Sequence, residues 1–137
     1  FFNVLNKFRA EGFKCPGKTF KPNPTPLRFD CRLWKAAQLH SQDMADKDYF
    51  SHRSKDGRGF TDRTWAQGIK ATGEICAAGT KIVVGGEVLF RQWQRSSGHC
   101  KGMGDPDQDL VGPGYGTNPD VSKRSYWTVN FSKNRRR

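Results

Sequence analysis

The sequence predicts one α+β domain, with helices first and a β-hairpin last. Apolar residues recur at helical spacing in segments 2–10 and 31–47, before any clear strand. Near the end, residues 125–131 alternate apolar and polar side chains, as in a half-buried strand. With 137 residues, including 10 Phe, 4 Trp and 3 Tyr, the chain is large enough to bury one core. We therefore expect a single domain over residues 1–132, followed by a basic tail at 133–137.

The first helix is predicted from the spacing of its apolar residues. Phe1, Leu5 and Phe8 share one face of a helix over residues 2–10. Gly12 follows as a natural stop.

The next part of the chain predicts a loop and then a longer helix. Four prolines and a glycine in residues 14–28 exclude a helix or a central strand, so we expect an ordered loop. Asp30 is placed to cap a helix from Cys31 to about Lys47. His40 falls on the apolar face of that helix, where the expected role is that of a hydrogen-bonded core histidine.

The middle of the chain predicts a short helix, a strand and an amphipathic helix. Thr61 or Asp62 can cap a short helix from Arg63 to Gln67. Residues 69–79 fit an extended segment. Residues 83–93 place apolar side chains at helical spacing.

The C-terminal part predicts two strands, 110–115 and 125–131, joined by a turn. Pro113 cannot donate to a sheet ladder, so the first strand is expected to be bulged or at an edge there. The preceding segment, 102–109, carries alternating aspartates but lacks the closing glutamate of a calcium-binding loop. We expect a solvated loop at that point.

The charge of the chain bears on its partners. The net charge is +11, and basic residues gather towards both ends. Such a surface attracts polyanions such as sulfated glycans, nucleic acid or anionic lipid. The aromatic residues are interleaved with apolar ones, as in a core, which argues against sequence-specific nucleic-acid binding. No apolar run approaches the ~20 residues of a membrane span, and the first residues do not resemble a signal peptide, so we expect a mature or trimmed extracellular product.

Four cysteines in a small, basic, turn-rich chain predict two disulfide bonds and an oxidising compartment. Three pairings are possible, and we expect Cys15–Cys31 and Cys76–Cys100. The first would close the proline-rich loop, and the second would join the two ends of the central segment. A zinc site that uses cysteines and histidines is disfavoured because the sequence has no C-x-x-C spacing.

Three residues are candidates for a functional site, namely His52, Glu74 and His99. Each lies next to a predicted helix or strand, and our hypothesis is that they converge in one cleft. Two imidazoles and a carboxylate can hold zinc with a fourth position open to water, which is also the layout of a catalytic metal site. A serine hydrolase is not expected, because the Gly-x-Ser-x-Gly elbow is absent and Ser97 is better explained as a turn residue.

Several short stretches of the sequence match one family in order and spacing. They are Leu5-Asn6-Lys7-Phe8-Arg9, Pro26-Leu27-Arg28-Phe29-Asp30, Ser41-Gln42-Asp43-Met44-Ala45, Tyr49-Phe50-Ser51-His52, Gly73-Glu74-Ile75, Ser97-Gly98-His99, Val111-Gly112 with Gly114-Tyr115-Gly116, and Tyr126-Trp127-Thr128-Val129-Asn130-Phe131. Together they resemble the CAP superfamily (cysteine-rich secretory proteins, antigen 5 and pathogenesis-related proteins), also called the SCP domain. The resemblance covers nearly the whole chain, and the region around His99 is closest to the shorter, bacterial-like members.

The resemblance implies a three-layer α-β-α sandwich with a central antiparallel sheet. It also implies a cleft of two histidines and up to two glutamates that can bind a divalent metal, with His52, His99 and Glu74 at the matching positions and zinc as the expected ion. Two family positions differ in this chain. Ile75 replaces the asparagine of the Gly-Glu-Asn motif, and residues 94–97 hold no second glutamate.

These observations favour a secreted, disulfide-stabilised binding protein that is not an enzyme. Its cleft would accept a divalent metal, and its basic surface would meet an anionic partner. The alternative is a metal-dependent hydrolase in which Glu74 is the general base on a metal-bound water. A second alternative, implied by the resemblance, is a sterol or lipid carrier. The missing second carboxylate favours the binding protein over the hydrolase.

Overall fold

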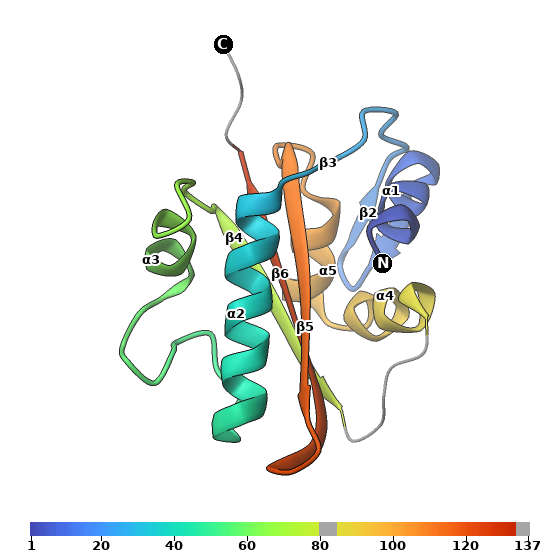
Figure 1. The fold of residues 1–137 in the computed structure, drawn as a ribbon. Coiled ribbons are helices and arrows are strands. Elements are labelled where there is room, and N and C mark those ends of the chain that lie inside the picture. Colours follow the sequence, from blue (N-terminus) through green and yellow to red (C-terminus); the bar gives the residue numbers. More distant parts are fainter. Residues whose placement is uncertain (80–84, 134–137) are drawn as a thin grey trace.

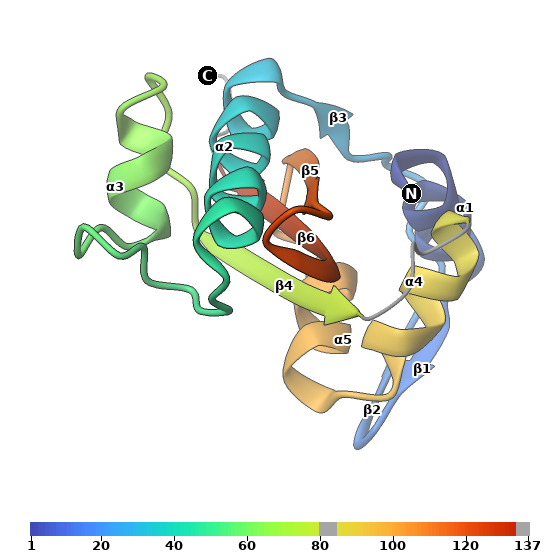
Figure 2. The same cartoon turned by 60° about the horizontal axis from the view of Figure 1, so that its bottom comes forward.

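A four-stranded sheet lies between two layers of helices in the computed structural model, which describes residues 1–79 and 85–133. The helices are α1 (Phe2–Glu11), α2 (Cys31–Lys47), α3 (Phe60–Trp65), α4 (Gly86–Gln94) and α5 (Ser97–Gly104), and the strands are β1 (Phe13–Cys15), β2 (Lys18–Phe20), β3 (Arg28–Phe29), β4 (Gly73–Gly79), β5 (Leu110–Asn118) and β6 (Ser122–Ser132). Helices α2 and α3 lie on one side of the sheet, and α1, α4 and α5 lie on the other (Figures 1 and 2). The three-layer α-β-α sandwich predicted above is confirmed.

The sheet has the strand order β3-β5-β6-β4 and is antiparallel except at its shortest strand. Strands β5 and β6 form a long hairpin, and β4 pairs with the other side of β6. Strand β3 runs parallel to β5 and pairs only with Leu110 and Val111. From Pro113 onward β5 is therefore an edge on that side, which confirms the predicted edge, since the missing N–H of proline breaks no ladder there.

Helix α2 packs directly against strand β5 because glycines alternate along that strand. A Cβ atom added to Gly112, Gly114 or Gly116 would lie 2.0, 2.3 or 2.5 Å from the nearest backbone atom of α2. Any larger residue at these positions would push the helix away from the sheet. The close approach of α2 brings the polar residues of that helix into the interior of the domain.

Most helix boundaries follow the predicted signals. Helix α1 begins and ends close to the predicted residues, and Asp30 caps α2 by accepting hydrogen bonds from the backbone N–H groups of Arg32 and Leu33. Helix α4 corresponds to the predicted amphipathic helix, although residues 83 and 84, where we expected it to begin, lie outside the described residues.

Several predicted elements and boundaries were wrong; for example, strands β5 and β6 extend to Asn118 and from Ser122, into the segment where a turn was expected. Helix α3 begins at Phe60, because its N-cap is Gly59; Asp62 lies in the first turn and accepts a hydrogen bond from the N–H of Gly59. Residues from Ser97 onward form helix α5, where a turn and then a loop were expected. The proline-rich segment is more than a loop, since it contains the two-stranded hairpin of β1 and β2, which is separate from the central sheet.

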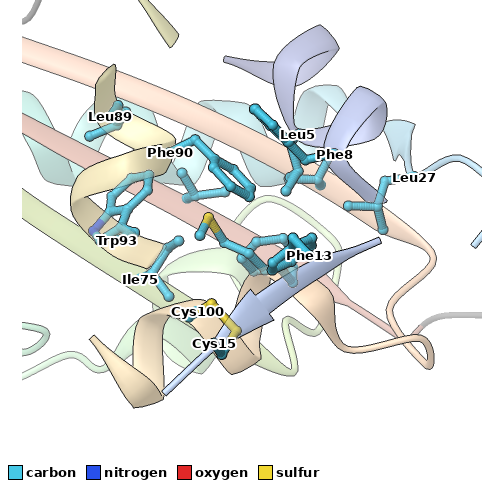
Figure 3. Packing of buried hydrophobic residues seen from close by; sticks show 14 residues of the cluster. Leu5, Phe8, Phe13, Cys15, Leu27, Ile75, Leu89, Phe90, Trp93 and Cys100 are labelled. Carbon is cyan, nitrogen blue, oxygen red and sulfur yellow. A yellow bond between two sulfur atoms is a disulfide. The ribbon is translucent and has the colours of Figure 1, made fainter. Parts of the chain in front are cut away.

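The main hydrophobic core fills the space between the sheet and the layer of α1, α4 and α5 (Figure 3). Phe8 of α1 and Phe90 of α4 stack with their ring centroids 4.3 Å apart. Trp93 is also buried here and donates from its indole N–H to the carbonyl of Cys76 in β4. Burying a side chain of this size contributes roughly 1.5–3 kcal/mol, so this face supplies much of the stability of the domain.

The disulfide pairing predicted from the sequence is wrong. Cys15 is bonded to Cys100, with a Cα–Cα distance of 5.6 Å, and Cys31 and Cys76 carry free thiols. The bond joins the end of β1 to α5 within the main core (Figure 3). Cys76 cannot reach Cys100, because its thiol contacts Glu74 and Thr128 on the other face of the sheet. Cys31 is the first residue of α2 and is exposed.

The C-terminal residues of the described chain are tied to the domain. Lys133 forms an ion pair with Asp105 at 3.3 Å, and its backbone N–H donates to the hydroxyl of Thr72. The rest of the predicted basic tail, residues 134–137, lies outside the described residues. Among the helices described here, none combines the length and apolar character needed to span a membrane.

Candidate functional site

The candidate site is built on β4, an outer strand of the sheet. Ile75 and Ala77 pack into the main core, so the alternation of side chains along the strand directs Glu74 and Cys76 to the opposite face. That face is covered by α2, α3 and the loop of residues 48–59 (Figure 2). The Glu74 side chain is fully buried there, with an exposed fraction of 0%.

Two basic side chains hold the two oxygens of the Glu74 carboxylate. Arg63 of α3 donates from Nη2 to Oε2 at 2.7 Å, and its side chain is only 4% exposed. His52, from the loop of residues 48–59, places Nδ1 3.0 Å from Oε1. The structure thus brings His52 and Glu74 together, and it adds a buried arginine that the sequence did not point to.

Arg63 also organises the loop that carries His52. Its Nη1 donates to the carbonyl of His52 at 2.8 Å, to the hydroxyl of Ser54 at 3.0 Å and to the carbonyl of Arg58 at 3.1 Å. One guanidinium thus connects helix α3, strand β4 and the loop between α2 and α3. The planar fork of arginine allows this set of contacts, which the single ammonium of lysine could not reproduce.

The contacts around Glu74 shift the pKa values of the groups involved. Burial alone would raise the pKa of Glu74, but the hydrogen bond with His52 and the charge of Arg63 outweigh it and lower that pKa. The hydrogen bond to Glu74 raises the pKa of His52, although its side chain is 58% exposed. Near neutral pH the carboxylate is therefore ionised, and its negative charge is balanced within the protein.

His40 behaves as the core histidine that the sequence predicts. Its Nε2 lies 2.8 Å from the carbonyl of Ser51, so this nitrogen carries the proton and donates it, and the Ser54 hydroxyl lies 3.4 Å from Nδ1. Burial, followed by the positive charge of Arg63, lowers the pKa of His40. The ring is therefore neutral near pH 7 and stabilises the start of the loop of residues 48–59.

A His/Glu/Cys group that could hold a metal ion lies at the same place. His40, Glu74 and Cys76 each offer one ligand atom within 4.8 Å of the others. His52 also approaches this group, since its Nδ1 lies 3.7 Å from Cys76 Sγ, which is itself 3.6 Å from Glu74 Oε1. The metal-capable group therefore includes a thiol that was expected to be in a disulfide.

A second set of three possible ligand atoms, in which His52 takes the place of His40, lies close together around Glu74. The pairwise distances among His52 Nδ1, Glu74 Oε1 and Cys76 Sγ are 3.0, 3.6 and 3.7 Å. Around a tetrahedral zinc ion, nitrogen, oxygen and sulfur ligands lie roughly 3.3–3.6 Å from one another, given Zn–N near 2.0 Å and Zn–S near 2.3 Å. Arg63 contacts the other carboxylate oxygen, Oε2, so Oε1 is the oxygen that an ion would share with His52 and Cys76.

His99, the third predicted ligand, lies on helix α5 on the other side of the sheet. Its Nδ1 is 3.0 Å from the hydroxyl of Ser96, and its ring is next to that of Trp93, with centroids 6.4 Å apart. Burial and then the charge of His52 lower the pKa of His99. The contacts that hold Glu74 are made by His52 and Arg63.

Sequence reasoning missed the roles of Arg63 and Cys76, and a usable signal existed for one of them. A strand at residues 69–79 was predicted, and its two-residue period already places Cys76 on the same face as Glu74. No comparable signal existed for Arg63, because its contact with Glu74 depends on how α3 packs against the sheet. Arg63 was instead expected to begin a short helix.

The chain resembles known proteins over most of its length. The profile of CAP, the cysteine-rich secretory protein family, matches residues 2–131. The chain is 37% identical to the uncharacterized protein YkwD of Bacillus subtilis over 108 residues, which are 77% of this chain but only 39% of the length of YkwD.

Two solved structures have a similar fold. An extracellular protein containing an SCP domain from Bacillus anthracis has a TM-score of 0.68 and 24% identity, covering 96% of this chain and 38% of that chain. An outer surface protein from Borrelia burgdorferi has a TM-score of 0.72 and 18% identity, covering 95% of this chain and 86% of that chain. With the family profile matched almost from end to end, the chain belongs to the CAP family, the cysteine-rich secretory protein family.

Proposed function

We propose that the chain is a secreted, disulfide-stabilised binding domain whose basic surface holds an anionic partner outside the cell. The observation that carries this proposal is the excess of 24 Lys and Arg residues over 13 Asp and Glu residues, a net charge of +11. A surface of this charge concentrates polyanions near it. The disulfide bond and the likeness to an extracellular protein of Bacillus anthracis support a location outside the cell.

The chemistry of the Glu74 site supports binding rather than hydrolysis. A general base needs a pKa near the working pH and a free oxygen towards the water that it activates. The pKa of Glu74 is lowered, and His52 and Arg63 hold its two oxygens. Burial and the charge of Glu74 raise the pKa of Cys76, so its thiol is not activated as a nucleophile.

We also propose that the site around Glu74 takes zinc through His52 and Glu74, with either Cys76 or His99 as the third ligand. When bound, zinc would supply a second positive charge next to Glu74 and hold the loop of residues 48–59 to β4. The donor distances described above favour Cys76, whereas the family pattern favours His99. Isothermal titration calorimetry with zinc chloride on the wild type, Cys76→Ser and His99→Ala distinguishes them, because only the true ligand weakens binding by tenfold or more when replaced.

The position of the ion provides an independent readout. Anomalous difference density at the zinc edge, from crystals grown with zinc, is expected next to Cys76 Sγ and Glu74 Oε1. Density between the rings of His52 and His99 would instead support the family arrangement. A wild-type protein that binds no zinc in calorimetry would contradict the metal part of the proposal without affecting the anionic partner.

The binding proposal is tested with immobilised heparin at increasing salt. Retention should persist at physiological ionic strength and exceed retention on a sulfopropyl resin of equal charge density. Desulfated heparin is the matched control and should release the protein at low salt. Elution from heparin at or below the salt that elutes it from the simple exchanger would show that the basic surface has no selective anionic partner of this kind.

A further inference from the structure

A basic hollow lies away from the Glu74 site, on the side of the sheet that carries α1 and α5. It has a volume of about 930 Å³ and is lined by residues of β2, by the segment 21–25, by Arg28 and by residues between Gly104 and Asp109. His52, Glu74 and Cys76 are not among its lining residues. The chemistry of the Glu74 site therefore makes no use of this hollow.

Three cationic side chains surround the hollow, namely Lys18, Lys21 and Arg28. All three residues are exposed, and within the described residues none of them forms an ion pair with a carboxylate. Lys18 lies with its Nζ 5.1 Å above the ring of Phe20. Their charges are therefore available to an anionic ligand.

Part of the wall between the cations is apolar, and it lies beside the polar residues Thr19, Asn23, Thr25 and Asp109. Phe20 packs tightly against Gly104, where an added Cβ would lie 2.3 Å from the ring. Pro22, Pro24 and Pro106 also line the hollow, and proline has no backbone N–H. An acidic peptide docking as an added strand would need such N–H groups, whereas a sugar ring needs only apolar surface for its C–H face and cations for its acidic substituents.

The hollow is held in shape by buried contacts. Arg9 of α1 is buried and donates from Nη1 to the carbonyls of Met103 and Asp105 at 2.8 and 3.1 Å, which fixes one wall. The backbone N–H of Asn23 donates to the carbonyl of Arg9 at 2.8 Å, which fixes the opposite wall to the same residue. The Cys15–Cys100 bond ties the hairpin of β1 and β2 to α5. A preformed site of this kind loses little conformational entropy when a ligand binds.

We propose that this hollow is the binding site for a sulfated glycan, with sulfate groups at Lys18, Lys21 and Arg28 and a sugar ring against Phe20 and the prolines. This inference rests on the proposed function, because it locates on the surface the anionic partner proposed above. It adds that binding depends on one place and not on the net charge of +11 spread over the whole domain.

The test measures the affinity of a fluorescent heparin hexasaccharide by polarisation at physiological salt. The site variant is the triple charge reversal Lys18→Glu, Lys21→Glu and Arg28→Glu. The matched control reverses three exposed charges elsewhere, at Lys35, Lys123 and Arg124, and so changes the net charge by the same amount. We expect the site variant to lose affinity at least tenfold and the control to lose less than threefold. Because each phosphate-like contact adds to the salt dependence, the slope of log Kd against log salt should fall by about two to three only in the site variant.

Several results would overturn the proposal in distinguishable ways. Equal losses in the two variants would show that the whole surface, and not the hollow, binds the glycan. If the wild type bound polyglutamate or phosphatidylserine vesicles as tightly as it binds the heparin hexasaccharide, the proposed preference for a glycan would be wrong. Absence of heparin binding in the wild type would contradict the proposed function itself. If the charge reversal fails to fold by circular dichroism, the neutral triple Lys18→Gln, Lys21→Gln and Arg28→Gln replaces it, with an expected loss of at least fivefold.

Discussion

On the side of α1, α4 and α5, the sheet is covered by large apolar side chains such as Phe90 and Trp93, whereas on the side of α2 and α3 it is covered by helix backbone and buried polar groups. Ser41 of α2, for example, donates to the hydroxyl of Thr128 in β6 at 2.8 Å. The candidate site lies on this second, polar face.

The difference explains why the two faces should respond differently to mutation. When a buried apolar side chain is removed, the domain loses the transfer free energy of that side chain and part of the packing around it. The neighbouring side chains can then relax and reduce this cost. A polar interior that loses one partner leaves the other buried and unpaired, which carries the full cost of desolvation. The strongest test of this comparison is therefore a change that leaves Glu74 buried without Arg63.

Replacing Arg63 with Ala should destabilise the domain by about 3–5 kcal/mol, because the Glu74 charge would stay buried without its main partner. Urea unfolding followed by circular dichroism measures this. The control is Arg58→Ala, whose ion pair with Asp56 is exposed on both sides, so its loss should change the stability far less.

A double variant sharpens the interpretation of the Arg63 result. Replacing both Arg63 and Glu74 with Met removes the charge pair together and should cost clearly less than Arg63→Ala alone. Equal costs in the single and double variants would mean that Arg63 acts by filling space and not by balancing Glu74.

On the apolar face the largest expected effect comes from the disulfide bond. Replacing Cys15 and Cys100 with Ser should cost roughly 2–5 kcal/mol, since the bond closes a loop between residues separated by 85 positions. Cys31→Ser is the control and should have no measurable effect, because that thiol is free and exposed.

Thiol chemistry checks the pairing itself. In the native protein iodoacetamide should modify Cys31 only, and after unfolding without reductant it should also modify Cys76. Labelling of Cys15 or Cys100 under either condition would contradict the observed disulfide bond.

The comparison of the two faces also shows how far the sequence could be read. The apolar spacing of α1 and α2, the cap at Asp30 and the alternation in β6 are local signals, and each was confirmed. The order of short stretches such as Tyr49-Phe50-Ser51-His52 then identified the family and with it the three-layer arrangement.

Features that depend on which face a residue occupies were harder to predict. The pairing of cysteines failed because it needed the knowledge that Cys76 and Cys100 lie on opposite sides of β4. The contact between Arg63 and Glu74 joins a short helix to a strand across a long loop, and no periodicity reports it. Local sequence patterns therefore predicted the elements, but the polar interior arises only when the layers are assembled.

The close contact between α2 and β5 predicts a smaller loss of stability when a glycine on the polar face is replaced. Gly114→Ala should destabilise the domain by about 1–3 kcal/mol, because the new Cβ would lie 2.3 Å from the backbone of Gln38. Gly98→Ala is the matched control. Gly98 is in helix α5 with open space around it, so alanine there should stabilise by about 0.5–1 kcal/mol. A neutral or stabilising Gly114→Ala would show that α2 can move away from the sheet at little cost.

The smallest expected effect concerns His52, which lies at the exposed rim of the polar face. Its pKa is raised by Glu74, so the contribution of His52 to stability is fully present below the ordinary histidine pKa of about 6.5 and is lost as pH rises through the higher folded value. His40 and His99 have lowered pKa values and act in the opposite direction, so the informative quantity is the difference between the wild type and His52→Gln.

Because His52 is 58% exposed, this difference should be below about 1 kcal/mol at pH 6 and should become smaller at alkaline pH, as the ring loses its proton. Urea unfolding of the two proteins at these pH values measures it. An NMR titration of the His52 ring should give a pKa above about 6.5 in the wild type and a lower one in Glu74→Gln. A difference that grows as pH rises, or a ring pKa that does not respond to Glu74→Gln, would show that the hydrogen bond between His52 and Glu74 does not stabilise the polar face.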